Sequence, residues 1–341
     1  MRVSAELPLG VASFFGESAR RRRRLEAELV ARLETQGFEE VILPVLDYVE
    51  PYEDLLTPEA RSELYRFSDR DGELVALRSD FTPLLARLVA PRLDSLPRPA
   101  RFFYRGDVVR YQEARIGRRR EMYQLGAELL GVAGEEGEDE ILVLLLELLG
   151  AATRRPVRVV LGLAGALEGL LAEDPDPDAL ARAVSRRERD QARRASLALL
   201  EVVEEGSPAD PGSLGQEAAP ALARLRERRD ALVGSVPGAR LEIDLAEFAL
   251  LRRPGALGDA GGERAYYDGL VFKAYVGREA LPIATGGRYD TLFARLGAAV
   301  PAVGFSVGLD RLVGANGSPS RVESAGAALV ASAEDHEERV P

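Results

Sequence analysis

Two strand-like runs joined by an arginine-rich loop, between residues 102 and 131, carry the side chains best suited to chemistry in this chain. An apolar-alternating run ends at Arg110, and a second run carries Gln124 and Glu128. Because these two side chains are four residues apart, the period of two in a strand places both on one face of a sheet. Guanidinium groups match carboxylates and phosphates in shape and charge. Taken alone, the segment is also typical of a solvated surface hairpin. With the rest of the chain, it predicts the floor of a site for a small zwitterion beside a nucleotide.

The composition restricts the chemistry that the other residues can do. The 341-residue chain has no cysteine, one histidine (His336) and one lysine (Lys273). Disulfides, thiolate chemistry, a histidine-based zinc site and a Ser-His-Asp triad within one chain are therefore excluded, and no Walker sequence surrounds Lys273. Any chemistry must use carboxylates, arginines, tyrosines and the backbone. We expect neither a metal nor a cofactor.

The balance of apolar and charged residues is that of a globular protein with a substantial core, at 46% hydrophobic and 30% charged. No apolar run reaches the length of a membrane span, and the N-terminal apolar run is broken by Pro8 and Gly10, unlike a secretory signal. We therefore expect a cytoplasmic protein without a membrane partner. The formal net charge of −11 argues against a nucleic-acid binder, tRNA included, although a local basic face can exist on an acidic protein.

The elements that must position these groups begin with an amphipathic helix over Ala19 to Gln36, where leucines recur at i, i+4 and i+8. The five-arginine run at residues 20–24 is compatible with nucleic-acid binding. On a helix, however, those arginines fan around the cylinder beside glutamates, which favours a solvated face. Residues 41–46 are apolar and β-branched around Pro44, as expected at the end of an edge or interface strand.

The middle of the chain alternates between buried and polar segments. The pattern predicts a buried helix over 136–152 with acidic residues at its start, followed by a buried strand over 157–163. Residues 175–236 are helical, polar and rich in Arg and Ala, and a strand returns at 240–245. The composition after Leu312 indicates a frayed tail.

Hairpin-like strands and blocks of helices predict an α+β fold with an antiparallel sheet and a helical insertion. The expected segments are the first part of the sheet domain at 1–174, the insertion at 175–236, the second part of the sheet domain at 237–313, and the tail at 314–341.

The segment described first resembles motif 2 of the class II aminoacyl-tRNA synthetases, in its histidyl form. In that family the first strand runs Phe-Arg-x-Glu and the second runs Phe-x-Gln-x-Gly-x-Glu. Here the first reads VRYQ at residues 109–112, and the second reads MYQLGAE at residues 122–128. The motif arginine is present as Arg110, whereas Gln112 stands in place of the glutamate.

Four further segments are similar to motifs of the same family and occur in the family's order. They are the helix over 19–36 with GFEEVILP (motif 1), ALRSDFTP at 76–83 (the amino-acid loop), RAYYDGLVFKAYV at 264–276 (the histidyl segment), and GGRYDTLFARLG with AVGFSVGLDRL ending at Leu312 (motif 3). The resemblance covers roughly residues 5–313. It implies a class II synthetase-like sheet and a dimer core formed with a second copy through motif 1.

The resemblance implies a histidine-binding site whose first half holds the amino-acid backbone. Asp80 and Thr82 are the carboxylate and threonine that bind the α-amino group. Arg110 faces the α-carboxylate, and Gln124 lies beside it.

The second half of the implied site holds the imidazole, whose two nitrogens need one acceptor and one amphoteric partner. Glu128 with Tyr266 and Tyr267 supplies these groups, and Tyr289 closes the pocket. Each tyrosine taken alone is typical of core packing. Their occurrence at motif positions together with Asp80 favours a ligand pocket.

The groups that activate an amino acid with ATP are preserved less well. Histidyl synthetases carry an arginine four residues before the paired tyrosines, and here that position is Gly262. Arg264 lies two residues before the pair, Gln112 removes a charged acceptor, and Arg311 keeps the motif 3 arginine. Adenylation needs charge neutralisation at the α-phosphate. The nucleotide side formed by Gln112, Arg264 and Arg311 is therefore expected to be vestigial.

This pattern resembles the regulatory subunits of ATP phosphoribosyltransferase, the first enzyme of histidine biosynthesis. That family has the histidyl-synthetase core without an anticodon-binding domain, and only 28 residues follow Val313 here. The resemblance implies a non-catalytic chain that assembles with a short-form catalytic subunit and contributes to feedback by histidine.

Two other hypotheses remain open from the sequence. One is an active histidyl-tRNA synthetase-like enzyme or amino-acid ligase without an anticodon domain, which Arg110 and Arg311 favour and Gln112 and Gly262 oppose. The other is a structural dimer scaffold that binds no ligand.

Overall fold

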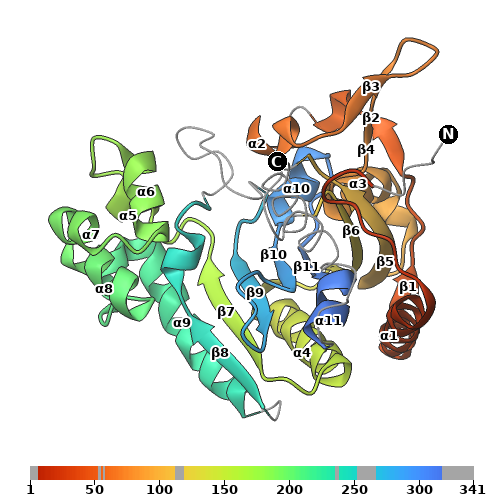
Figure 1. The fold of residues 1–341 in the computed structure, drawn as a ribbon. Coiled ribbons are helices and arrows are strands. Elements are labelled where there is room, and N and C mark those ends of the chain that lie inside the picture. Colours follow the sequence, from red (N-terminus) through yellow and green to blue (C-terminus); the bar gives the residue numbers. More distant parts are fainter. Residues whose placement is uncertain are drawn as a thin grey trace, which may run out of the picture.

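The centre of the molecule is an eight-stranded sheet with the order β1-β5-β6-β11-β10-β9-β7-β8 (Figure 1). The computed structural model describes residues 7–52, 55, 56, 58–111, 119–234, 238–251 and 266–316. In sheet order the strands are β1 (Glu39–Glu40), β5 (Ala100–Val109), β6 (Glu121–Leu130), β11 (Ala302–Gly308), β10 (Ala284–Arg288), β9 (Leu270–Val276), β7 (Val157–Leu163) and β8 (Ala239–Ile243). The β1–β5 and β7–β8 pairs are parallel and the other five are antiparallel. The predicted α+β fold with an antiparallel sheet is confirmed.

The hairpin of β5 and β6 is the longest pairing in the sheet and carries the residues on which the sequence prediction centred. Its register pairs Phe102 with Glu128 and Gly106 with Gln124. Successive side chains of a strand point to opposite faces, so Gln124 and Glu128 share one face, while Leu125 lies in the core on the other.

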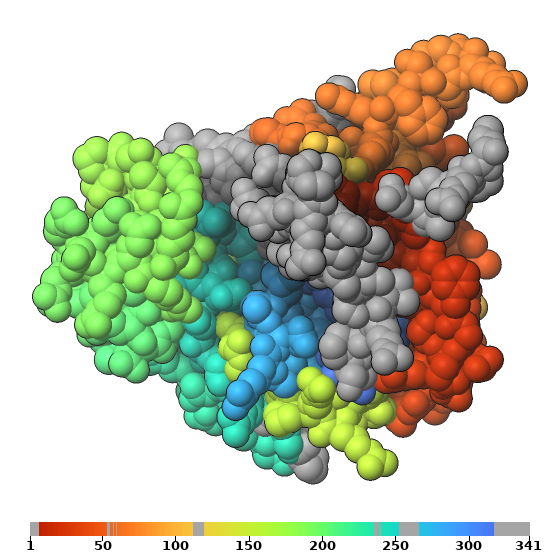
Figure 2. Space-filling view, viewed as in Figure 1, coloured from red at the N-terminus to blue at the C-terminus, as the bar shows by residue number. Residues whose placement is uncertain are grey.

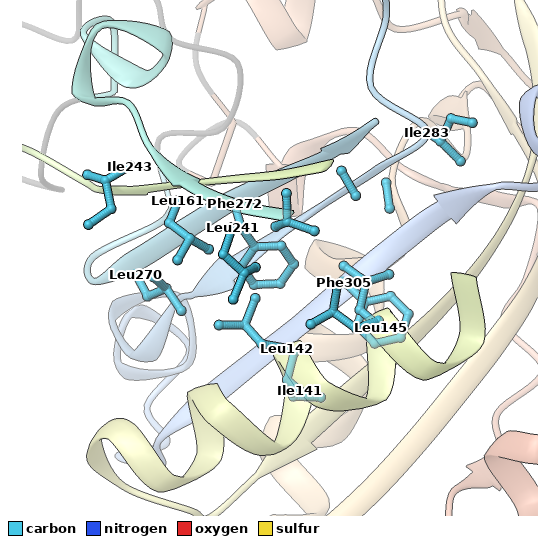
Figure 3. Packing of buried hydrophobic residues seen from close by; sticks show 14 of the residues in the cluster. Ile141, Leu142, Leu145, Leu161, Leu241, Ile243, Leu270, Phe272, Ile283 and Phe305 are labelled. Carbon is cyan, nitrogen blue, oxygen red and sulfur yellow. The ribbon is translucent and has the colours of Figure 1, made fainter. Parts of the chain in front are cut away.

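One face of the sheet is covered by α4 (Gly134–Ala152), with α1 (Gly16–Thr35) beside it and α11 (Leu309–Ala315) against α1. In Figure 3, Ile141, Leu142 and Leu145 of α4 point towards the strands, where Phe272 and Phe305 meet them. These side chains are fully or almost fully buried, and burial of such apolar surface is the main favourable term in folding. No helix in the described part of the chain is both long enough and apolar enough to cross a membrane.

The opposite face carries α3, α10 and a separate small sheet. The elements here are η1 (Glu50–Tyr52), α2 (Pro58–Ser62), α3 (Phe81–Val89), η2 (Ala90–Ser95), α10 (Asp290–Arg295) and the strands β2 (Leu46–Tyr48), β4 (Leu74–Leu77) and β3 (Arg66–Ser68). The three strands pair antiparallel in the order β2-β4-β3. A second core cluster fills this side, in which Phe81 of α3 stacks on Tyr104 of β5 with the ring centres 4.3 Å apart.

A group of helices follows β7 in the sequence. It lies at the opposite end of the molecule from α1 and the small sheet (Figure 1). It comprises α5 (Glu168–Leu171), α6 (Pro177–Ser185), α7 (Arg189–Ala195), α8 (Leu197–Glu205), η3 (Pro211–Leu214) and α9 (Gly215–Val233), and η4 (Leu245–Phe248) follows β8. Buried residues of these helices, including Val184, Leu199 and Leu222, belong to the same core cluster as α4 and the sheet.

The strand expected at residues 41–46 is not formed. Only Glu39–Glu40 pairs with β5, and pairing resumes at Leu46 in the small sheet. Pro44 lacks a backbone N–H and so cannot donate to a strand ladder. Of the segment's apolar side chains, Leu43 is buried in the second core cluster, whereas Ile42 is 89% exposed.

Gly126 provides a test of how tightly the face of the sheet that carries Glu128 is packed. A Cβ at this position of β6 would overlap the buried ring of Tyr104 on β5. We expect Gly126→Ala to lower the free energy of unfolding by about 1–3 kcal/mol through overpacking. Gly150→Ala is the matched control, because Gly150 is exposed in α4 with room for the methyl that alanine adds, and helix propensity predicts a gain of up to about 1 kcal/mol. Urea unfolding of both variants measures the contrast, and equal effects would contradict the packing argument.

Candidate functional site

A cavity of about 330 Å³ opens at one end of β6, β9, β10 and β11. This volume is at the lower end of the range for small-molecule pockets. Each strand contributes a polar side chain to the lining, among them Gln124 of β6, Lys273 of β9, Thr285 of β10 and Ser306 of β11. Residues of η4 and the segment after it form an apolar wall with Phe248 at its base. The cavity therefore combines apolar walls with a few polar groups, as binding sites for small polar molecules do.

Four of the residues predicted from the sequence line this cavity, namely Arg110, Gln124, Tyr267 and Arg311. Gln124 has a distinctive environment. Its side chain is buried, and its Oε1 has no hydrogen-bond partner among the described residues. A buried acceptor without a donor costs free energy, so this atom is poised to accept a hydrogen bond from a ligand.

Asp80 lies behind the lining of the cavity, next to Arg110. Arg110 Nη2 is 3.5 Å from Asp80 Oδ2, which is longer than a good hydrogen bond, while Arg110 Nε donates to the carbonyl oxygen of Ser79 at 2.7 Å. Asp80 also accepts from the backbone N–H of Thr82 and so caps the N-terminus of α3. The hydroxyl of Tyr266 lies 3.5 Å from the same carboxylate. Because the contact between Asp80 and Arg110 is long, these two groups can exchange it for the ammonium and carboxylate of a zwitterion.

Glu128 lies one layer deeper and is only 1% exposed. Its carboxylate accepts hydrogen bonds from the hydroxyls of Thr82 at 2.8 Å, Tyr104 at 3.1 Å and Tyr289. Burial raises the pKa of Glu128 to about 7, although the three hydroxyl donors oppose the rise. A side chain at Gly304 of the neighbouring strand would overlap this carboxylate, so glycine is required there.

This deeper layer shows which predicted residues meet and which do not reach the cavity. Thr82 and Tyr289 both donate to Glu128, and Arg110 and Tyr266 both lie against Asp80 as a second group. Tyr266 bridges the two groups, since its ring centre is 4.9 Å from that of Tyr267 and 5.8 Å from that of Tyr289. Of the predicted residues that the structure describes, five lie outside the cavity lining: Asp80, Thr82, Glu128, Tyr266 and Tyr289.

The sequence prediction missed Tyr104, which supplies one of the three donors to Glu128. The sequence does contain a related feature, Gly126: Tyr104 pairs with it across the hairpin and needs the space that a glycine leaves. That requirement only becomes visible once the register of β5 on β6 is known.

The nucleotide side of the site is described in part. Gln112 and Arg264 lie outside the described residues. Arg311 lines the cavity and donates to the carbonyl oxygen of Pro282 at 3.0 Å. Next to it, Asp310 is buried and lines the same cavity, and burial raises the pKa of its carboxyl.

The arginine run at the start of α1 differs from the uniformly solvated face that the sequence predicts. Arg22 is only 17% exposed, lies 4.1 Å from the ring centre of Tyr123, and its Nε is 3.3 Å from Asp310 Oδ1. Arg119 approaches the other oxygen of Asp310 at 3.6 Å. The helix turns one arginine of the run inward, because Asp310 of α11 is a buried carboxylate that needs cationic neighbours. The other arginines of the run are exposed.

The single lysine also belongs to the cavity, which the sequence did not reveal. Lys273 Nζ is 3.0 Å from Glu247 Oε1 and lies over the ring of Phe248. Tyr275 donates to the same oxygen of Glu247 at 2.8 Å. Burial tends to raise the pKa of Glu247, but Lys273 and Tyr275 outweigh it and lower that pKa. Among the residues that the structure describes, no cluster of His, Cys, Asp and Glu could hold a metal ion.

Comparison with known proteins shows which family has this sequence and fold. The histidyl-tRNA synthetase family model matches residues 10–312. The ATP phosphoribosyltransferase regulatory subunit of Moorella thermoacetica is 34% identical over 96% of this chain and 86% of that protein. A Bacillus halodurans structure described as an ATP phosphoribosyltransferase regulatory subunit/histidyl-tRNA synthetase has a TM-score of 0.75 at 24% identity, covering 98% of this chain and 92% of that one. A chain of the ATP phosphoribosyl transferase complex from Thermotoga maritima has a TM-score of 0.61 at 20% identity, covering 84% of this chain and 97% of that one.

The fold and the site define a class II synthetase-like domain of the histidyl type. Within that class, the chain belongs to the family of ATP phosphoribosyltransferase regulatory subunits. Its role is regulatory, in the first step of histidine biosynthesis, and not catalytic.

The buried carboxyl of Glu128 predicts a pH dependence of stability. Its pKa is about 7 in the folded chain and about 4.3 in an unfolded one. Its contribution is therefore fully present below the unfolded pKa and is lost as the pH rises through 7, by on the order of 3 kcal/mol. We expect wild type to lose more stability than Glu128→Gln between pH 5 and pH 8, as measured by urea unfolding.

Glu147→Gln is the control for that measurement, because Glu147 is exposed on α4 and the chemical change is the same. It should leave the pH dependence as in wild type. If Glu128→Gln also follows the wild-type curve, Glu128 does not titrate in this range.

Proposed function

We propose that this regulatory subunit senses free histidine in the cavity and relays its occupancy to a short-form ATP phosphoribosyltransferase catalytic subunit. The observation that carries the proposal is the unpartnered Oε1 of buried Gln124, which faces the cavity beside the loose Asp80–Arg110 pair. An acceptor, a carboxylate and a guanidinium within one site are the groups that recognise the backbone of an amino acid.

Histidine would complete the interactions that the residues of the site leave weak among themselves. Its ammonium would donate to Gln124 Oε1 and, as Arg110 turns to the α-carboxylate, to Asp80. Its imidazole would lie against Tyr267, with Glu128 fixing the surrounding tyrosines from below through Tyr289. The imidazole needs both a donor and an acceptor, which tyrosine hydroxyls and a carboxylate network can supply.

Binding without activation is what distinguishes a sensor from a synthetase. Adenylation requires cationic groups on the α-phosphate, and the expected arginine position is Gly262 in this sequence. Histidine then remains bound as an effector. If it binds one assembly state more tightly than another, that difference in affinity shifts the equilibrium between them and produces feedback.

The same proposal includes assembly in the cytoplasm. The neighbouring Thermotoga maritima structure is described as a complex of ATP phosphoribosyl transferase, and this chain shares its fold. Within such a complex we propose that two copies of this chain pair through motif 1. The support is the apolar surface left open around the unpaired segment, where Ile42, Val45, Leu46 and Tyr48 are all exposed. Exposed apolar patches of this kind mark protein interfaces.

Gln124→Leu tests the histidine site. The leucine keeps the bulk of the side chain and removes the acceptor, at a cost of about 1–2 kcal/mol in histidine binding. The concentration of histidine that half-inhibits the reconstituted complex should therefore rise by roughly tenfold. The measurement is a histidine titration of ATP phosphoribosyltransferase activity, and activity without histidine should remain near wild type.

Gln216→Leu is the matched control, since Gln216 is an exposed glutamine on α9 and does not line the cavity. Superimposed titrations for all three proteins would mean that histidine acts elsewhere. Histidine-dependent exchange between ATP and pyrophosphate at a rate typical of synthetases would instead support the enzyme hypothesis.

Ile42→Glu tests the dimer. A charge placed in a buried apolar interface is costly, so this variant should be monomeric at micromolar concentration while wild type is dimeric. Multi-angle light scattering gives the mass of each. Val233→Glu, at an exposed apolar position on α9, should leave the dimer intact. A monomeric wild type would refute the pairing.

A further inference from the structure

The helices beyond β7 carry a concentrated basic surface on a chain that is acidic as a whole. Between residues 182 and 194 there are six arginines and two carboxylates, whereas the full chain has a net charge of −11. We define the arginine face as Arg186, Arg189, Arg193 and Arg194, in and next to α7. All four side chains are exposed.

Most of this positive charge is not neutralised within the chain. In the described part of the chain, Arg186, Arg193 and Arg194 form no ion pair. Arg194 donates only to the carbonyl oxygen of Asp190 in its own helix, and Arg189 pairs with Glu204 of α8. By contrast, Arg20 and Arg24 of α1 both pair with Glu17.

We propose that the arginine face is the surface through which this chain docks on an acidic surface of the ATP phosphoribosyltransferase catalytic subunit. The proposal deepens the assembly described above and rests on it. Complementary charge steers such an encounter and fixes its orientation, while apolar contact supplies affinity. Leu197, 73% exposed at the start of α8, provides an apolar centre next to the arginines.

The composition of the face favours a protein over a nucleic acid. Glu188 and Asp190 lie among the arginines and would repel a phosphate backbone, but they fit a protein surface of mixed charge. The exposed Leu197 likewise gains nothing from contact with phosphates, because an apolar side chain makes no hydrogen bond to them. The position of the arginine face argues against a second copy of this chain as the partner, because the exposed apolar segment between β1 and β2 lies at the other end of the molecule (Figure 1).

The arginine face also adjoins the cavity, and a regulatory subunit requires such a connection between its docking surface and its sensing site. The end of α6 joins the two: Ser185, its last residue, lines the cavity, and Arg186 in the turn that follows begins the arginine face. Between α6 and α7, Arg187 adopts a left-handed backbone conformation, with φ at 61°, and pairs with Asp244. Asp244 in turn caps η4, which carries Glu247 of the cavity lining.

Arg187 also donates to the carbonyl oxygens of Val202 and Val203, each at 3.2 Å, at the end of α8. A non-glycine residue in this conformation is strained and must be held by its contacts. The contacts around Arg187 therefore hold α7, α8 and η4 in fixed relation. Figure 2 shows these helices protruding at one side of the molecule, where a large partner can reach them.

The test is Arg186→Glu combined with Arg193→Glu and Arg194→Glu, which reverses the three charges that have no ion pair within the described residues. Affinity for the purified catalytic subunit is measured by titration calorimetry at low and physiological salt. We expect the dissociation constant to rise at least tenfold, and the salt sensitivity seen for wild type to be lost or inverted. Histidine binding to the isolated chain should be unchanged, which shows that the fold and the cavity are intact.

Two further variants keep the result interpretable. Arg92→Glu, Arg98→Glu and Arg278→Glu change the net charge equally at exposed positions outside the face, and should bind within about twofold of wild type. Replacing the same three arginines by glutamine should give an intermediate loss of affinity for the catalytic subunit. This variant replaces the charge-reversed protein in the test if that protein does not fold.

Each alternative has its own outcome. Wild-type affinity in the charge-reversed protein, or an equal loss in the dispersed control, would overturn the docking surface while leaving the regulatory function intact. Loss of the homodimer in light scattering would assign the face to self-association instead. Salt-sensitive binding of unfractionated tRNA that disappears with the reversal, without any change in binding of the catalytic subunit, would assign it to nucleic acid. If wild type does not bind the catalytic subunit at all, the assembly itself fails along with the docking surface.

Discussion

The carboxyl of Glu128, enclosed in the protein interior and held by three hydroxyls, sets the geometry on which the binding site depends. Thr82 at the start of α3, Tyr104 on β5 and Tyr289 beside α10 all donate to it, so one buried group ties together segments far apart in the sequence. A buried carboxyl is tolerated only with such partners. Neighbouring strands must in turn leave room, as Gly304 does.

This buried layer separates the rigid part of the site from the part that can respond to a ligand. The tyrosines around Glu128 are fixed by hydrogen bonds and ring packing, whereas Asp80 and Arg110 meet only at 3.5 Å and Gln124 has an acceptor unsatisfied by the described residues. A ligand that satisfies these groups gains free energy without reorganising the core. That arrangement suits reversible binding.

The two ends of the molecule present different surfaces, one apolar and one basic. The segment around Ile42 presents apolar surface beside α1, while the helices beyond β7 present arginines at the far end (Figure 1). The cavity lies between them and adjoins the arginine face at the end of α6. A class II synthetase-like sheet can thus serve regulation, because its pocket sits where strands from both parts of the chain converge.

The sequence by itself determined the fold class, the length of α4, the strand β7 and the shared face of Gln124 and Glu128. Local periodicity encodes all of these. It also brought together the residues of the site, through motifs whose order survives in the chain. Tertiary structure alone decided that Tyr104 completes the bonding of Glu128, that Arg22 turns inward to Asp310 and that Lys273 pairs with Glu247 at the cavity. It also decided that residues 41–46 do not form the expected strand. These outcomes depend on strand register and on which side chains long-range packing brings together, and neither is written in the spacing of a single segment.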